Sequence, residues 1–197
     1  MYQNKIITEP KWKSWIIQTT TPLFTPDQCN QIIASGRAQK PQQAQVGMNK
    51  PEGETDTKKR VTTISWIPFQ EMGHMYQDLN TFIQKANENH FGFGDIQVTE
   101  QAQFTEYPEG GFYDWHMDCD VNMEHEPPVR KISMTVLLND PSEFEGGHLE
   151  LMAPGKFAEL KQGHAICFAS FLNHRVNPVT RGMRQSLVVW FGGKPFR

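Results

Sequence analysis

The chain has 197 residues, of which 38% are hydrophobic and 21% charged, and its formal net charge at pH 7 is -3. This length suits one globular domain, expected over residues 1–197, and the composition excludes fibrous and disordered classes. The slightly acidic balance argues against nucleic acid or an anionic membrane as a partner, because both attract concentrated positive charge.

The N-terminal segment, residues 1–22, lacks the long apolar core of a signal peptide, and no apolar run approaches the ~18–20 residues that a spanning helix needs. Cys29, Cys119 and Cys167 are odd in number and far apart, which does not indicate a disulfide framework. We therefore expect a soluble protein of a reducing compartment, the cytoplasm.

Two helices are predicted in the N-terminal half. The sequence TPDQ at residues 25–28 is typical of a helix start, with Thr as N-cap, Pro in the first turn and Gln placed to close a capping box. Ile32 and Ile33 would face inward, and Gly36 would end this helix. A second helix is predicted over residues 70–89, where apolar residues form one stripe. They are Met72, Tyr76, Leu79, Phe82, Ile83 and Ala86.

The segment between these helices, residues 40–60, is polar and almost without core residues. Two interpretations stay open: a surface loop, or a mobile lid over a substrate. Long structureless loops are uncommon inside compact domains and often have a function.

The second half of the chain has short segments rich in β-branched and aromatic residues, separated by Gly, Pro and Asn turns. About eight strands at this spacing indicate a β-sandwich or jelly roll with the helices packed on one sheet. We expect a mainly β fold with flanking helices, a double-stranded β-helix whose core spans residues 96–197 and whose helical support spans residues 1–95. The predicted strands are Val61–Trp66, Gln97–Tyr107, Tyr113–Asp118, Lys131–Leu138, His148–Met152, His164–Phe168, Arg175–Val176 and Gln185–Phe191.

A metal site is predicted at the H-x-D sequence formed by His116 and Asp118. Residues two apart on a strand point to the same face, so the imidazole and the carboxylate would converge. His174, which lies 58 residues further on, would complete a facial triad of two histidines and one carboxylate, the arrangement of non-heme Fe(II) oxygenases. An H-x-D sequence alone is common by chance, so the rest of the pattern must support it.

That support comes from Arg184 and Ser186, which share one face of a predicted strand. An arginine inside a β-sandwich is costly unless it pairs with an anion, and its planar guanidinium grips a carboxylate with two bonds. A dicarboxylic co-substrate would suit Arg184, with its other end on the metal. A salt bridge to an internal Asp or Glu is the alternative.

Other histidines and aspartates compete for the metal role. His148 and His164 each follow a glycine and open a strand, and either could be a ligand in a cupin-like site, but neither has an arginine at the matching distance. The remaining candidates are interpreted as surface, packing or rim residues. They are His74, His90, His125, Asp114 and Asp120.

Residues 104–191 resemble the prolyl 4-hydroxylase branch of the 2-oxoglutarate oxygenases, including the bacterial PKHD-type hydroxylases. The matching blocks are FTEYPEGGFYDWHMD, KISMTVLLND, EGGHLEL and HRVNPVTRGMRQSLVVWF. The last is the most specific, with a distal His, a P-V-T-x-G stretch, a basic residue and a strand ending in an aromatic. The resemblance implies that His116, Asp118 and His174 bind Fe(II), and that Arg184 binds the distal carboxylate of 2-oxoglutarate.

The same resemblance implies further contacts. RVTTISWIP, residues 60–68, is similar to the strand that follows the mobile substrate loop of the oxygen-sensing prolyl hydroxylases, which makes residues 43–59 the matching loop. We predict that Arg60, Tyr113 and Trp190 contact the substrate.

Tyr107, Thr135 and Ser186 are predicted to line the co-substrate site beside Arg184. A tyrosine that helps to hold 2-oxoglutarate in some members corresponds here to Leu137, and Thr135, which faces the same way, would take over its role.

The resemblance implies a hydroxylase that consumes O2 and decarboxylates 2-oxoglutarate to succinate and CO2, with ascorbate as reductant. The favoured substrate is a peptidyl proline in a protein or peptide. The rival interpretations are an oxygenase of a free amino acid, a small metabolite or a nucleobase, and a non-catalytic jelly roll that keeps a metal. The acidic balance and the lack of a second arginine downstream of Arg184 disfavour the nucleobase.

Overall fold

The computed structural model describes residues 14–43, 59–119, 128–153 and 159–195. Within these ranges the strands pair antiparallel in a large sheet of eight strands, a small sheet of four and a ribbon of two. The large sheet runs β1-β11-β8-β14-β6-β4-β2 with β5 beside β14, the small sheet β10-β12-β7-β3, and the ribbon β13-β9. This confirms the predicted jelly-roll class.

The strands of the large sheet are β1 (Ile16–Gln18), β2 (Gln42–Gln43), β4 (Thr63–Ile67), β5 (Gln97–Val98), β6 (Ala102–Tyr107), β8 (Val129–Leu137), β11 (Ala165–Ala169) and β14 (Arg184–Gly193). The small sheet contains β3 (Arg60–Val61), β7 (Phe112–His116), β10 (Leu149–Leu151) and β12 (His174–Val176). The ribbon is β9 (Phe144–Gly146) with β13 (Val179–Gly182), and the helical elements are α1 (Pro26–Ala38), α2 (Gly73–Ala86), the π-helical turn η1 (Asn87–Phe91) and the 3-10 turn η2 (Pro141–Glu143).

Helix α1 begins as predicted, with a capping box. The Thr25 hydroxyl accepts from the Gln28 N–H at 3.3 Å, and the Gln28 side chain accepts from the Thr25 N–H at 2.8 Å. The prediction that Gly36 ends this helix is wrong, because the helix continues to Ala38. Gly36 lies buried against the ring of Phe104, where a Cβ atom would overlap the ring. The glycine is therefore needed for close packing rather than for termination.

Helix α2 is shorter than the predicted range of 70–89. It begins at Gly73, and its last predicted turn belongs to the π-helical turn η1. Four residues of the predicted stripe are buried, with Leu79 and Ile83 fully enclosed, and Met72 and Phe82 are partly buried. The Tyr76 hydroxyl accepts from the Ala102 N–H at 2.7 Å, which fixes α2 against β6. No helix in the described ranges is both long and apolar enough to cross a membrane.

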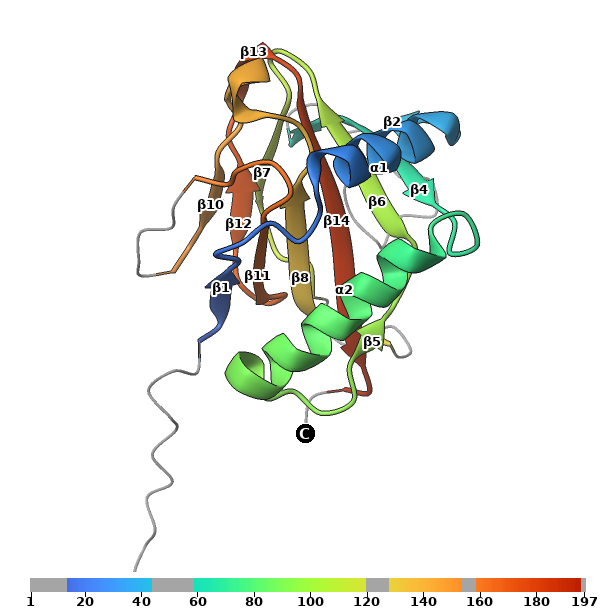
Figure 1. Cartoon of the computed structure of the whole chain (residues 1–197). Helices are drawn as coiled ribbons and strands as arrows, with labels where there is room; N and C mark the ends of the chain where they lie inside the picture. The colour runs from blue at the N-terminus through green and yellow to red at the C-terminus, as the bar shows by residue number, and fades with distance from the viewer. Residues whose placement is uncertain (1–13, 44–58, 120–127, 154–158, 196–197) are drawn as a thin grey trace, which may run out of the picture.

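Both helices pack on one face of the large sheet, and the small sheet lies on its other side (Figure 1). Strand β8 shows why the two faces differ. Ile132 and Met134 belong to the apolar core beneath the helices, whereas the alternate residues Ser133 and Thr135 face the small sheet. The interior between the two sheets is therefore lined partly by polar side chains.

Two predicted strands are divided in the structure. The predicted strand Gln97–Tyr107 is divided into β5 and β6, and between them both the N–H and the hydroxyl of Thr99 donate to the Trp190 carbonyl. The predicted strand Val61–Trp66 is shared by both sheets, with β3 in the small sheet and β4 in the large one. Thr62 stands at the crossing, where its hydroxyl donates to the Glu106 carbonyl at 2.7 Å. Strands β1, β2, β9 and β13 were not predicted.

Candidate metal centre

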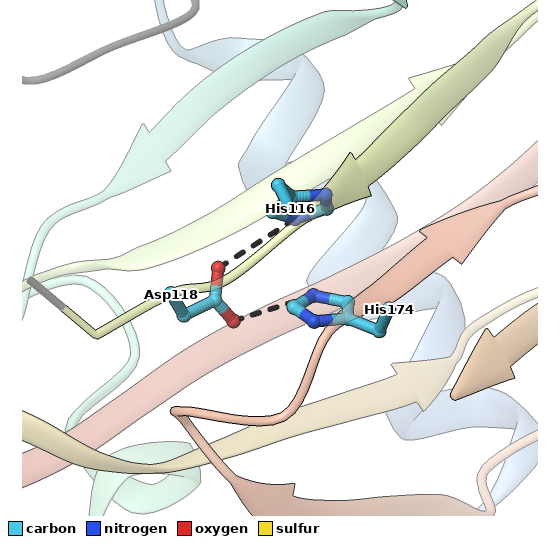
Figure 2. A group of neighbouring side chains, drawn as sticks. All are labelled: His116, Asp118 and His174. Atoms are coloured by element: carbon cyan, nitrogen blue, oxygen red, sulfur yellow. Dashed lines mark ion pairs between the residues drawn. The ribbon is translucent and has the colours of Figure 1, made fainter. Parts of the chain in front are cut away.

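Three predicted ligands come together between the sheets (Figure 2). His116 ends β7, His174 begins β12, and the two residues are directly paired in the small sheet. The ligand atoms of His116, Asp118 and His174 all lie within 4.8 Å of one another. Asp118 faces both rings, with 3.7 Å from its Oδ1 to His116 Nε2 and 3.5 Å from its Oδ2 to His174 Nε2.

The contacts that position Asp118 differ from the predicted ones. The strand ends at His116, so strand alternation does not place the carboxylate. The Asp118 N–H instead donates to the Ser170 carbonyl at 3.0 Å, and the Ser133 hydroxyl donates to Asp118 Oδ2 at 2.7 Å. Ser133 Oγ is also 2.9 Å from Ser170 Oγ. The aspartate is thus oriented by the large sheet and by the loop before β12.

Backbone carbonyls orient both imidazoles. His116 Nδ1 lies 2.8 Å from the Asp114 carbonyl, and His174 Nδ1 lies 3.0 Å from the Leu172 carbonyl. A carbonyl can only accept, so Nδ1 carries a proton in each ring, and Nε2 is the nitrogen left to bind a metal. Metal-binding histidines are commonly oriented in this way.

The charge state of the three groups suits a metal cation. Burial lowers the pKa of His116 to about 4, and the neighbouring His174 lowers it further, so the ring is neutral at pH 7. Burial acts to raise the pKa of Asp118, but His174, His116 and the Ser133 hydroxyl outweigh it and hold the pKa below its usual value. The site therefore offers two imidazoles and one carboxylate. This donor set fits Fe(II) with coordination positions left open.

Arg184 lies buried at the start of β14, with 3% of its surface exposed. Its Nη1 donates to Ser186 Oγ at 3.0 Å, and its Cζ lies 5.6 Å from the centre of the Tyr107 ring. Within the described ranges Arg184 forms no ion pair with a carboxylate, so the alternative of an internal salt bridge finds no partner there. A Cβ atom at Gly147 would lie 2.8 Å from Arg184 Cδ, so this glycine allows the loop to cover the arginine.

Comparison with known proteins agrees with this geometry. Residues 102–192, which contain all three ligands and Arg184, match the family model described as the 2OG-Fe(II) oxygenase superfamily. The match covers a little under half of the chain and includes the whole of the candidate site.

Curated relatives are similar to part of the chain. The PKHD-type hydroxylase of Teredinibacter turnerae is 35% identical over 118 residues, which cover 56% of this chain and 52% of the relative. The PKHD-type hydroxylase of Colwellia psychrerythraea is 34% identical over 130 residues, covering 63% and 58%. The chain thus spans a little over half the length of these relatives.

Solved structures show the same fold over nearly the whole chain. A prolyl-4-hydroxylase of Pseudomonas putida superposes with a TM-score of 0.68 at 22% identity, covering 92% of this chain and 94% of its own. The viral collagen prolyl hydroxylase of Paramecium Bursaria Chlorella virus-1, in its 2OG complex, gives a TM-score of 0.70 at 16% identity, covering 92% and 97%.

The residues predicted to contact a substrate lie in two places. Tyr113 stacks on His116, with ring centres 3.5 Å apart and an interplanar angle of 15°, and Arg60 lies over the other side of Tyr113 at 4.3 Å. Burial raises the pKa of Tyr113, with Arg60 acting in the opposite direction. Trp190 is the cross-strand partner of Ser133, and the Cζ of Arg130 is 3.8 Å from its ring centre.

The predicted co-substrate residues line one face of the large sheet. Tyr107 is the cross-strand partner of Arg184, and Ser186 is the partner of Leu137. Thr135 is buried two residues before Leu137 and two residues after Ser133, so it lies between the arginine and the metal ligands along β8. These positions agree with the predicted roles, which remain predictions.

The competing metal ligands lie elsewhere. His148 is exposed beside Glu159, His164 Nδ1 lies 3.1 Å from the Thr19 carbonyl, and Asp114 accepts from the Trp115 N–H. His74 lies in α2 and His90 in η1. His125, Asp120 and almost all of the predicted loop 43–59 lie outside the described residues.

Sequence reasoning missed Ser133, Gln103 and Gly147, which contact Asp118, Arg60 and Arg184 respectively. Alternation along the predicted strand Lys131–Leu138 could have indicated Ser133, because it shares a face with Thr135. The contacts of Gln103 and Gly147 join segments far apart in the sequence and gave no local signal.

Proposed function

We propose that the protein is an Fe(II)- and 2-oxoglutarate-dependent dioxygenase that hydroxylates peptidyl proline. One observation carries the proposal: a triad of two imidazoles and a carboxylate shares the space between the sheets with a buried arginine. The triad suits Fe(II), and the arginine suits the far carboxylate of a dicarboxylic acid.

Each residue of the candidate site has its own proposed role. His116, Asp118 and His174 would hold Fe(II), which when bound supplies the activation of O2 for C–H hydroxylation, coupled to conversion of 2-oxoglutarate to succinate and CO2. Arg184 and Ser186 would hold the distal carboxylate, with Tyr107 and Thr135 beside it. Ser133 keeps Asp118 oriented.

The choice of substrate rests on the relatives. PKHD-type hydroxylases are similar to part of this chain, and a prolyl hydroxylase of Trichoplax adhaerens, solved with a hypoxia inducible factor peptide fragment, has a TM-score of 0.65. These likenesses favour a peptide substrate for this chain, which we expect to enter beside Tyr113. Ascorbate would keep the iron reduced.

Two further proposals concern the chain as a whole. Residues 1–197 would form one oxygenase domain, because strands from the first third of the chain pair within the large sheet. The cytoplasm suits the three cysteines, which are all buried and form no disulfide within the described ranges.

The decisive experiment measures succinate formation from 2-oxoglutarate with Fe(II), ascorbate and proline-containing peptides, while mass spectrometry follows the gain of one oxygen atom by the peptide. His116→Ala, Asp118→Ala and His174→Ala should each abolish both signals and keep the circular dichroism of the wild type. Wild-type turnover in all three variants would refute the site. Succinate formation without peptide oxidation would retain the dioxygenase and exclude these peptides as substrates.

A further inference from the structure

Arg60 is a second buried arginine between the two sheets. Its side chain runs from β3 of the small sheet to β6 of the large one, where Nη2 donates to Gln103 Oε1 at 3.1 Å. Only 8% of the residue is exposed, and Nε is buried without a hydrogen-bond partner. Throughout the described part of the chain, Arg60 forms no ion pair with a carboxylate.

The position of Arg60 relates it directly to the metal centre. Arg60 and Tyr113 are paired across β3 and β7, and the guanidinium lies 4.3 Å from the centre of the Tyr113 ring. The other face of Tyr113 stacks on His116 at 3.5 Å. One aromatic ring thus separates the guanidinium from a ligand of the proposed iron.

The surroundings of Arg60 parallel those of Arg184. Each guanidinium lies over a tyrosine, and each donates to a neutral side chain, Gln103 or Ser186. A guanidinium stays protonated at physiological pH, and a buried charge without a counter-ion is unfavourable. The proposed function assigns an anion to Arg184 and none to Arg60.

We propose that Arg60 binds a carboxylate of the substrate, which makes the substrate an amino acid or a peptide with a carboxylate close to the oxidised carbon. This inference rests on the proposed function, because the two carboxylates of 2-oxoglutarate are assigned to the metal and to Arg184. A neutral peptide carbonyl could also accept from Arg60, but it would leave the buried charge uncompensated.

The test compares acids with their amides in the absence of turnover. The protein is loaded with Mn(II) and 2-oxoglutarate and titrated by calorimetry with N-acetyl-L-proline and N-acetyl-L-prolinamide, which differ only in the carboxylate. The same pairs are used for N-acetyl amino acids with aliphatic, aromatic and acidic side chains. At least one acid should bind about tenfold or more tightly than its amide, because a charge-assisted bidentate pair is lost in the amide.

Arg60→Gln removes the charge and should abolish the preference for the acid, while Arg60→Lys should retain part of it. Arg181→Gln is the matched control, since it removes the same charge from an exposed residue paired with Glu145. The affinity for 2-oxoglutarate should stay within about threefold of wild type in all three variants. Arg60→Gln should fold with an unchanged or higher Tm, because it removes an unpaired buried charge. If it does not fold, the preference for the acid is measured in Arg60→Lys, where it should be smaller than in the wild type.

The outcomes separate this inference from the proposed function. If the wild type binds no 2-oxoglutarate, the proposed function fails, and the inference that rests on it fails too. If 2-oxoglutarate binds but no acid exceeds its amide, or the preference survives in Arg60→Gln, the role of Arg60 alone is refuted.

Discussion

Replacing Arg184 by alanine is expected to weaken the binding of 2-oxoglutarate and to leave metal binding intact. Arg184 is only 3% exposed, so solvent screens its charge little. Truncating one partner of a buried charge pair costs roughly 2–5 kcal/mol, which corresponds to roughly 30-fold to several thousand-fold in Kd. Arg184→Lys should lose less, about tenfold, because a lysine keeps the charge but offers no fork of parallel donors.

The assay is calorimetric titration of 2-oxoglutarate into the Mn(II)-loaded protein, with Mn(II) titrated separately into the metal-free protein. Arg181→Ala is the control, because this arginine is exposed and its Nε bonds Glu145 at 2.9 Å. It should change neither affinity by more than about twofold.

Two results would refute the reasoning. If Arg184→Ala binds 2-oxoglutarate as tightly as the wild type, the co-substrate binds elsewhere or is a different molecule. If metal affinity is lost together with 2-oxoglutarate affinity, Arg184 has a structural role instead.

Three further predictions test the supporting structure. Ser133→Ala removes the hydrogen bond to Asp118 Oδ2 and should weaken Mn(II) binding about 10- to 100-fold in calorimetry, whereas an unchanged affinity would exclude the orienting role. Gly36→Ala should lower the free energy of unfolding by about 1–3 kcal/mol in urea, since its Cβ would overlap Phe104, and equal stability would contradict the packing argument. In the metal-free protein, the pKa of His116 is lowered to about 4, so on acidification the unfolded chain binds a proton at this histidine before the folded chain does. The free energy of unfolding should therefore fall by up to about 3 kcal/mol between about pH 6.5 and pH 4. A flat profile over that range would show that His116 titrates normally.

Local sequence was sufficient for several features. The capping box of Thr25 and Gln28 depends on residues three apart, and the apolar stripe of α2 depends on helical spacing, so both could be predicted without knowledge of the rest of the chain. The chemistry of the site was also visible, because few roles other than metal and anion binding suit His116, Asp118, His174 and Arg184 together.

Tertiary structure decided how those residues are held. Strand periodicity predicted that Asp118 would converge with His116, but the strand ends before the aspartate, and contacts with Ser133 and Ser170 position it. The end of α1 was mispredicted for a similar reason, since the packing partner of Gly36 is Phe104, a residue of the sheet. A short sequence window contains neither partner.

The hydrogen bond between Arg60 and Gln103 is the clearest example of a contact that local sequence could not predict. The predicted strand Val61–Trp66 gave no sign that the chain passes from one sheet to the other at Thr62. That crossing puts Arg60 on the small sheet, opposite Gln103 on the large one. The sequence by itself determined which chemical groups the site contains. Only the packing of the two sheets decided which of those groups are buried, paired or left without a partner, because burial and pairing depend on segments that are distant along the chain.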